Sequence, residues 1–158
     1  AREHILRLAC ISTGIPLAIL RLSGVYGPGD THNSPIRAFI TKALAGQTLR
    51  VKGNGSELRD FLHLGDLCEV VTHVIRQSIV GTFNVVSGCS CSIGGILKVI
   101  ERCCGHHLEV SFEGRQEDND LIFERSALLA RIPGFRFTSI EEGLARTVQY
   151  YQSQPCPV

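Results

Sequence analysis

The sequence lacks a charge excess, a long hydrophobic run and methionine, and each absence narrows what the protein can be. Its 16 basic and 15 acidic side chains give a formal net charge of +1, so no basic field is available to attract nucleic acid or a membrane surface. No apolar run approaches the roughly 20 residues that span a bilayer, and no basic segment followed by an apolar stretch opens the chain. We therefore expect a cytoplasmic protein with no nucleic-acid or membrane partner.

The missing methionine and the start at Ala1 predict that these 158 residues belong to a longer protein. The seven cysteines show neither a repeated C-x-x-C nor the spacing of a disulfide framework, which favours reduced thiols. Cys103 and Cys104 adjoin His106 and His107, but neighbouring residues on a helix point to different faces, so we expect no metal site. With 44% hydrophobic residues, the chain has enough apolar side chains for a soluble domain with a sizeable core.

Helical and strand patterns alternate along the chain. Residues 1–13 carry apolar side chains at helical spacing, and the apolar run Ile15–Leu22 is typical of a parallel strand covered on both faces. Further helices are expected at residues 35–45, 66–77, 93–103, 126–130 and 139–152, and further strands at 49–51, 59–64, 82–86 and 108–112. Asp66 and either Thr138 or Ser139 are expected N-caps. The alternation predicts an α/β fold, and the short, scattered strands predict an incomplete sheet.

Arg59 and Arg115 are candidate anion-binding residues. Arg59 follows the Gly-rich turn at residues 53–55, and its planar guanidinium can match a phosphate with two parallel hydrogen bonds. Arg115 offers a second such group, and together they could neutralise a diphosphate, which carries about two charges. Asp118 can accept hydrogen bonds from sugar hydroxyls. Spacing alone leaves open the alternative that each arginine is an ordinary surface residue.

Two segments resemble landmarks of a known family. Residues 55–66 fit the pattern G-x-x-x-R-D-F/Y-x-H-x-x-D, and Arg21–Pro28 fits the strand and turn that come before it. The matched positions are Gly55, Arg59, Asp60, Phe61, His63 and Asp66. On these motifs the chain is similar to the extended short-chain dehydrogenase/reductases, the NAD-dependent nucleotide-sugar epimerases and dehydratases. Further similar segments lie at residues 38–46, 81–85 and 139–144, so the resemblance covers nearly all of the chain.

The resemblance implies a fold and a domain division. The chain would be the carboxyl-terminal part of an NAD(P)-binding, Rossmann-like extended short-chain dehydrogenase, with an incomplete sheet plus a small substrate-binding subdomain. Residues 1–31 would be the tail of the dinucleotide-binding domain, and residues 32–158 would mainly form the nucleotide-sugar-binding subdomain, with some elements returning to the main sheet. The sequence contains neither the family's Gly-rich dinucleotide loop nor its Tyr-x-x-x-Lys catalytic pair, and we expect both upstream of Ala1.

The resemblance also implies roles for individual residues near the diphosphate, the sugar and the nicotinamide ring of NAD or NADP. The implied substrate-binding residues are Arg59, Arg115, Asp118, Asn33 and Ser34, and the implied cofactor-binding residues are Leu22 and Ser23. No catalytic residue and no metal ligand is expected in these 158 residues. His63 and Asp66 match the family pattern, but we interpret both as structural, because neither has an evident nucleophile partner in the sequence.

Some positions depart from the family pattern. Gly24 stands where many members have an Asn that contacts the substrate. Lys52 replaces an aromatic residue that often stacks on the nucleotide base, and Gly65 replaces a common acidic residue. The sequence therefore does not predict which sugar or which base is bound.

The implied activity is transient oxidation of a nucleotide sugar. A Tyr beside a Lys takes a hydroxyl proton while the nicotinamide accepts a hydride, which returns after epimerisation or dehydration. We predict that this chain is the substrate-binding half of such an enzyme, inactive alone and a possible homodimer at full length. Two alternatives remain open: a nucleotide-sugar reductase or dehydrogenase on the same scaffold, and a non-catalytic module that binds a nucleotide sugar or a protein.

Overall fold

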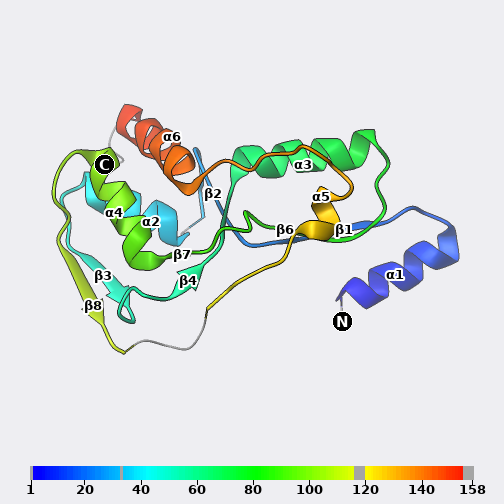
Figure 1. Cartoon of the computed structure of the whole chain (residues 1–158), viewed down its shortest axis with the longest axis horizontal. Coiled ribbons are helices and arrows are strands. Elements are labelled where there is room, and N and C mark those ends of the chain that lie inside the picture. The colour runs from blue at the N-terminus through cyan, green and yellow to red at the C-terminus, as the bar shows by residue number, and fades with distance from the viewer. Residues whose placement is uncertain (1, 33, 116–119, 155–158) are drawn as a thin grey trace.

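The computed structural model describes residues 2–32, 34–115 and 120–154, in which helices and strands alternate (Figure 1). The helices are α1 (Arg2–Thr13), α2 (Pro35–Leu44), α3 (Leu64–Arg76), α4 (Ile93–Cys104), α5 (Ser126–Leu129) and α6 (Ile140–Ser153). The strands are β1 (Ala18–Leu22), β2 (Gly24–Tyr26), β3 (Leu49–Lys52), β4 (Leu58–Arg59), β5 (Phe61–His63), β6 (Gly81–Val85), β7 (Cys91–Ser92) and β8 (Val110–Glu113). The predicted α/β class is confirmed.

Within the described residues the strands pair two by two and do not form one wide sheet. β1 pairs with β6, β2 with β5 and β3 with β8, all in parallel. β4 pairs with β7 in the antiparallel direction. Parallel neighbours that are joined through helices are typical of α/β proteins, and their short, separate pairs agree with the predicted incomplete sheet.

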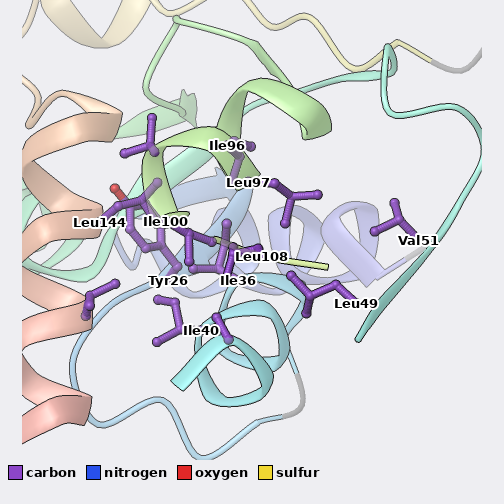
Figure 2. Packing of buried hydrophobic residues seen from close by; sticks show 13 residues of the cluster. Tyr26, Ile36, Ile40, Leu49, Val51, Ile96, Leu97, Ile100, Leu108 and Leu144 are labelled. Atoms are coloured by element: carbon purple, nitrogen blue, oxygen red, sulfur yellow. The ribbon is translucent and has the colours of Figure 1, made fainter. Parts of the chain in front are cut away.

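Two groups of buried apolar side chains hold these pairs together. In the first, which we call the three-helix core, Ile36 of α2, Ile100 of α4 and Leu144 of α6 point toward a common interior around Tyr26 (Figure 2). The second, which we call the sheet-side core, contains Leu62, Val70, Val74, Ile79, Phe83, Val85, Leu128 and Ile132. Full burial of a Leu or Ile side chain contributes roughly 1.5–3 kcal/mol, so these two groups are the main source of stability in the described residues.

Tyr26 connects the end of β2 with α6. Its side chain is 2% exposed, and its ring stands edge-on to Phe61 with the ring centroids 6.3 Å apart. A Cβ atom added at Gly143 would lie 2.0 Å from the Tyr26 hydroxyl oxygen, so only glycine fits at this point of α6. Burial raises the pKa of Tyr26, which keeps the phenol protonated. The residue four positions later is Asp30, so Tyr26 does not begin a Tyr-x-x-x-Lys pair.

Helices α4 and α6 begin and end at local signals. The Ser92 hydroxyl accepts a hydrogen bond from the Gly95 N–H at 3.1 Å, and Gly105 ends α4 with a left-handed φ of 77°. Of the two residues proposed to cap α6, Ser139 is the N-cap, and its hydroxyl accepts from the Glu142 N–H at 3.2 Å.

The N-terminus of α3 differs from the prediction. The helix begins at Leu64 with His63 as its N-cap, because the His63 Nδ1 atom accepts from the Gly65 N–H at 3.2 Å. The predicted cap, Asp66, lies inside the first turn. Its carboxylate accepts from the backbone N–H and the hydroxyl of Thr138 at 2.9 and 2.7 Å, so it connects α3 to the segment that leads into α6.

The predicted strand at residues 59–64 is divided. β4 ends at Arg59 and β5 begins at Phe61, and the two pieces pair with different partners, β7 and β2. Asp60 lies between them with its side chain buried and bonded to other segments. The division is therefore set by long-range contacts that a sequence pattern does not show.

The first strand also starts later than predicted. β1 begins at Ala18 and not at Ile15, and Pro16 within that interval has no N–H for a strand partner. The parallel direction is confirmed by its pairing with β6. However, Leu22 is 47% exposed, so the prediction of a strand covered on both faces is wrong for the described residues.

Helix α1 lies at one end of the molecule, away from the three-helix core (Figure 1). None of its described residues is buried, and Ile5, Leu6, Leu8 and Ile11 are 52–78% exposed. Polar contacts hold it to the strands, including a 2.6 Å hydrogen bond from the Arg7 guanidinium to the Thr82 hydroxyl. None of the helices in the described part of the chain has the length and apolar character needed to cross a membrane.

Candidate functional site

Arg59 lines a small cavity beside the carboxyl end of β3. The cavity has a volume of about 320 Å³ and is lined by Phe39, Arg50, Val51, Lys52, Gly53, Glu57, Arg59 and Ile93. Three of these side chains are cationic and one is acidic, while Phe39 and Ile93 supply apolar walls. Such a cavity suits an anion that also carries a flat or apolar part.

The local structure fixes Arg59 at this wall. It is half-buried at the end of β4, where its backbone pairs with Cys91 of β7, and its Nη1 atom donates to the Leu58 carbonyl at 2.8 Å. Glu57 is 4% exposed, and its carboxylate accepts from the Asn54 N–H at 3.2 Å within the Gly-rich turn. The turn therefore holds the acidic group at the wall of the cavity, and the strand end presents the cationic group to it.

The segment that carries Arg115 begins beside the same end of β3. β3 and β8 run in parallel with Lys52 opposite Glu113, and the Gly53 N–H donates to the Glu113 carbonyl at 2.9 Å. Arg115 follows two residues later and is exposed. The backbone thus brings the segment that carries Arg115 to the Lys52–Gly53 end of the cavity. Asp118, the other half of the predicted R-x-x-D element, lies outside the described residues.

Ser34 takes part in a loop of hydrogen bonds at the start of α2. Its hydroxyl accepts from the Arg37 N–H at 3.3 Å and donates to the Asp30 carboxylate, while another oxygen of Asp30 accepts from the His32 N–H at 2.8 Å. These contacts give Ser34 a capping role, and its contact with substrate stays a prediction. Asn33 lies outside the described residues.

Leu22 and Ser23, the predicted cofactor-binding residues, lie where β1 ends. Leu22 pairs with Val85 of β6, and the Ser23 N–H donates to the Val85 carbonyl at 3.4 Å. The Ser23 hydroxyl donates to Asp60 at 2.7 Å. The predicted position of these residues beside a nicotinamide stays a prediction.

Asp60 was not assigned a role from the sequence, although it belongs to the matched motif. The structure places its carboxylate, 3% exposed, among four hydrogen-bond donors from Ser23, Ser87 and Gly88. The available signal was an acidic residue inside a predicted strand, because a carboxylate that becomes buried there must find donors.

His63 and Asp66 make contacts that support their structural interpretation, and Asn84 bonds to the backbone of a distant segment. His63 caps α3, and its ring stands edge-on to Tyr26 at 5.6 Å between centroids. Burial lowers its pKa, against the opposing effect of the Asp66 carboxylate. Asn84 donates to the Glu124 carbonyl at 3.1 Å. None of these contacts faces the Arg59 cavity.

A larger cavity, of about 820 Å³, lies between α4 and β8. Basic Lys98 and His107 face acidic Glu101 and Glu109 there, and the Glu101 carboxylate already pairs with His107 at 2.7 Å. Because its charges are balanced and it contains no predicted site residue, the smaller, cationic cavity is the candidate site. In the described ranges, the cysteines are free thiols and no group of His, Cys, Asp and Glu is arranged to hold a metal ion; Cys156 lies outside them.

Comparison with known proteins identifies the family. The sequence pattern of the NAD dependent epimerase/dehydratase family matches residues 1–85. The low-salt glycan biosynthesis protein Agl12 of Haloferax volcanii is 29% identical over 140 residues, which are 87% of this chain and 45% of that protein. A dTDP-glucose 4,6-dehydratase of Xanthomonas campestris pv. campestris is 37% identical over 86 residues, which are 54% of this chain and 24% of that protein.

A solved structure shows the same fold over nearly the whole chain. It is the UDP-N-acetylglucosamine 4-epimerase of Methanobrevibacter ruminantium in complex with UDP-N-acetylmuramic acid, with a TM-score of 0.85 and 25% identity. The match covers 97% of this chain and 51% of that one, and the chain spans less than half the length of the curated relatives named above. The predicted Rossmann-like fold is confirmed, and the chain belongs to the NAD dependent epimerase/dehydratase family, the extended short-chain dehydrogenase/reductases of nucleotide-sugar metabolism.

Proposed function

We propose that this chain is the nucleotide-sugar-binding half of an NAD-dependent epimerase or dehydratase. Residues 1–31 complete the dinucleotide-binding domain, and residues 32–158 mainly form the substrate-binding subdomain. The observation that carries the proposal is the group of Arg50, Lys52 and Arg59 around one cavity, with Arg115 leaving the adjacent strand end.

The diphosphate is the part of the substrate that this cavity suits best. A diphosphate carries about two negative charges, and Arg59 and Arg115 can each donate two parallel hydrogen bonds to a phosphate. Lys52 adds a point charge, and its aliphatic stem can cover part of a base. Phe39 and Ile93 supply the apolar surface that a base requires. Relatives named for UDP-linked and dTDP-linked sugars support this substrate class.

The cofactor segment is the end of β1. NAD, when bound, supplies a hydride acceptor and returns the hydride at the end of the reaction. Leu22 and Ser23 would lie beside its ring, with the Ser23 hydroxyl held by Asp60 and the backbone held by β6. The chain's own task is therefore to bind the diphosphate, orient the sugar toward this segment and exclude water from between them.

The proton-transfer groups must come from outside these residues. The sequence contains neither a Tyr-x-x-x-Lys pair nor a Gly-rich dinucleotide loop. We propose that the segment that carries both packs on α1 and the open side of β1, where Ile5, Leu6, Leu8, Ile11 and Leu22 are exposed. Covering these side chains would remove from water an apolar surface that the 158 residues leave open.

Replacing Arg59 tests the binding role. In the enzyme that includes both halves, Arg59→Ala should weaken binding of UDP or dTDP by about 2 kcal/mol, roughly 30-fold in Kd, because a charged donor to the diphosphate is lost. Isothermal titration calorimetry measures the change. Arg76→Ala, at the exposed end of α3, is the matched control and should leave Kd unchanged. Equal affinity of the Arg59 variant and the wild type would remove Arg59 from the site.

A further inference from the structure

The Asp60 carboxylate joins three chain segments that are distant in sequence. Its Oδ1 atom accepts from the Ser23 hydroxyl at 2.7 Å and from the Ser87 N–H at 2.9 Å. Its Oδ2 atom accepts from the Ser87 hydroxyl at 2.9 Å and from the Gly88 N–H at 2.8 Å. Ser23 follows β1, Ser87 and Gly88 follow β6, and Asp60 itself separates β4 from β5. One buried charge thus fixes the ends of both parallel pairs that meet there.

The position of Asp60 next to Arg59 gives this arrangement a functional meaning. In extended backbone, consecutive side chains point to opposite sides. Arg59 lines the cationic cavity, whereas Asp60 is 3% exposed and faces the β1 and β6 ends. A shift of the Asp60 backbone would therefore move the arginine on one side and release the Ser23 segment on the other.

We propose that Asp60 is a positioning residue that holds the diphosphate-binding arginine and the cofactor-side segment Leu22–Ser23 at a fixed separation. The inference rests on the proposed function, because it uses the roles assigned to Arg59 and Ser23. Hydride transfer requires the sugar and the nicotinamide within a near-attack distance, and a misplacement of about 1 Å can cost roughly 100-fold in rate. Asp60 would set this distance without touching substrate or cofactor.

Asp66 provides a matched control. It is another buried carboxylate, 5% exposed, and it too accepts a backbone N–H and a hydroxyl, both from Thr138. Its contacts connect α3 to the segment before α6 and do not reach Arg59 or Ser23. A purely structural role for Asp60 predicts that Asp60→Asn and Asp66→Asn behave alike.

The experiment compares these variants in the enzyme that includes both halves. Asn offers one acceptor oxygen and turns an NH₂ group toward donors, so Asp60→Asn should lower kcat about 100-fold and raise the Kd for UDP about tenfold. Asp66→Asn should lose thermal stability but keep kcat and Kd within about twofold for the folded fraction. If Asp60→Asn does not fold, Ser87→Ala removes one of the four hydrogen bonds to Asp60, together with the acceptor of the Cys89 N–H, and should lower kcat about fivefold with a smaller loss of stability than Asp60→Asn.

The outcomes separate this inference from the proposed function. If Arg59→Ala weakens UDP binding but Asp60→Asn and Ser87→Ala change kcat and Kd no more than Asp66→Asn, Asp60 is only a structural residue and the inference is overturned. If Arg59→Ala leaves UDP binding intact, the diphosphate site is wrong and the inference fails with it. A drop in kcat and affinity that is specific to Asp60 and Ser87 supports it.

Discussion

Helices α1 and α4 each contain 12 residues, yet they are held in the molecule in different ways. α4 buries Ile96, Leu97, Val99 and Ile100 between α2 and α6, whereas α1 buries none of its described residues. α1 is attached through polar contacts such as the exposed Glu3–Arg21 ion pair, and exposed pairs of this kind contribute little. The comparison indicates that the chain completes its own core around the proposed substrate site but leaves the proposed cofactor side open.

The largest effect is expected when the activity of the 158 residues is measured without the other half. Because the open side lacks a Tyr-x-x-x-Lys pair and a Gly-rich loop, we expect the purified 158 residues to show no epimerase or dehydratase turnover with NAD and a UDP- or dTDP-linked sugar. Chromatographic separation of substrate and product sugars measures it. Robust turnover by protein of this length would contradict the proposal that this chain binds the substrate and that another segment supplies the catalytic pair.

A pair of equivalent substitutions tests the difference in packing directly. Ile100→Ala in α4 removes a side chain that is 0% exposed, so it should lower the free energy of unfolding by roughly 2–5 kcal/mol. Ile11→Ala in α1 removes one that is 78% exposed and should change it by less than about 0.5 kcal/mol. Urea unfolding followed by circular dichroism measures both.

The same two substitutions can also be compared in the enzyme that includes both halves. If the dinucleotide-binding segment covers α1, Ile11→Ala should become clearly destabilising in the enzyme that includes both halves, while the effect of Ile100→Ala stays the same. An Ile11 effect that is equally small in both contexts would mean that α1 stays uncovered.

The smallest expected effect is a pH dependence of the free energy of unfolding. It concerns His63, whose ring contacts Tyr26 of the three-helix core. Burial lowers the pKa of His63 from 6.5, so the unfolded chain binds a proton there more readily than the folded chain does. The resulting stability is present above pH 6.5 and is lost as the pH falls through the folded pKa. Unfolding free energies at about pH 7.5 and 5.5 should therefore differ less in His63→Asn, which keeps an acceptor for the α3 cap, than in the wild type. The same pH dependence in both proteins would show that other groups cause it.

Elements that are marked by local sequence signals were predicted better than elements that depend on long-range contacts. Pro35 at a helix start and Gly105 at a helix end mark α2 and α4 correctly, because such residues act within one turn. The break at Asp60 and the short strand β2 were missed, since both depend on partners 27 to 37 residues away.

The candidate site shows the same limit. The family motif identified Arg59, which the structure places in a cationic cavity, and the parallel pairing of β3 with β8 brings the Arg115 segment to that end. The motif did not reveal Asp60, because its function depends on which donors surround it and not on its neighbours in sequence. Asn33 and Asp118 lie outside the described residues, so their roles stay predictions.

The fit between Tyr26 and Gly143 has a consequence for building hybrid enzymes. α6 contains one glycine, and the Tyr26 hydroxyl occupies the space that a larger residue would take there. A shift of α6 by one turn would set Ser139 or Thr147 against that hydroxyl, so the helix has a single axial register. Exchange of α6 between relatives should therefore succeed only when the residues equivalent to Tyr26 and Gly143 are transferred together.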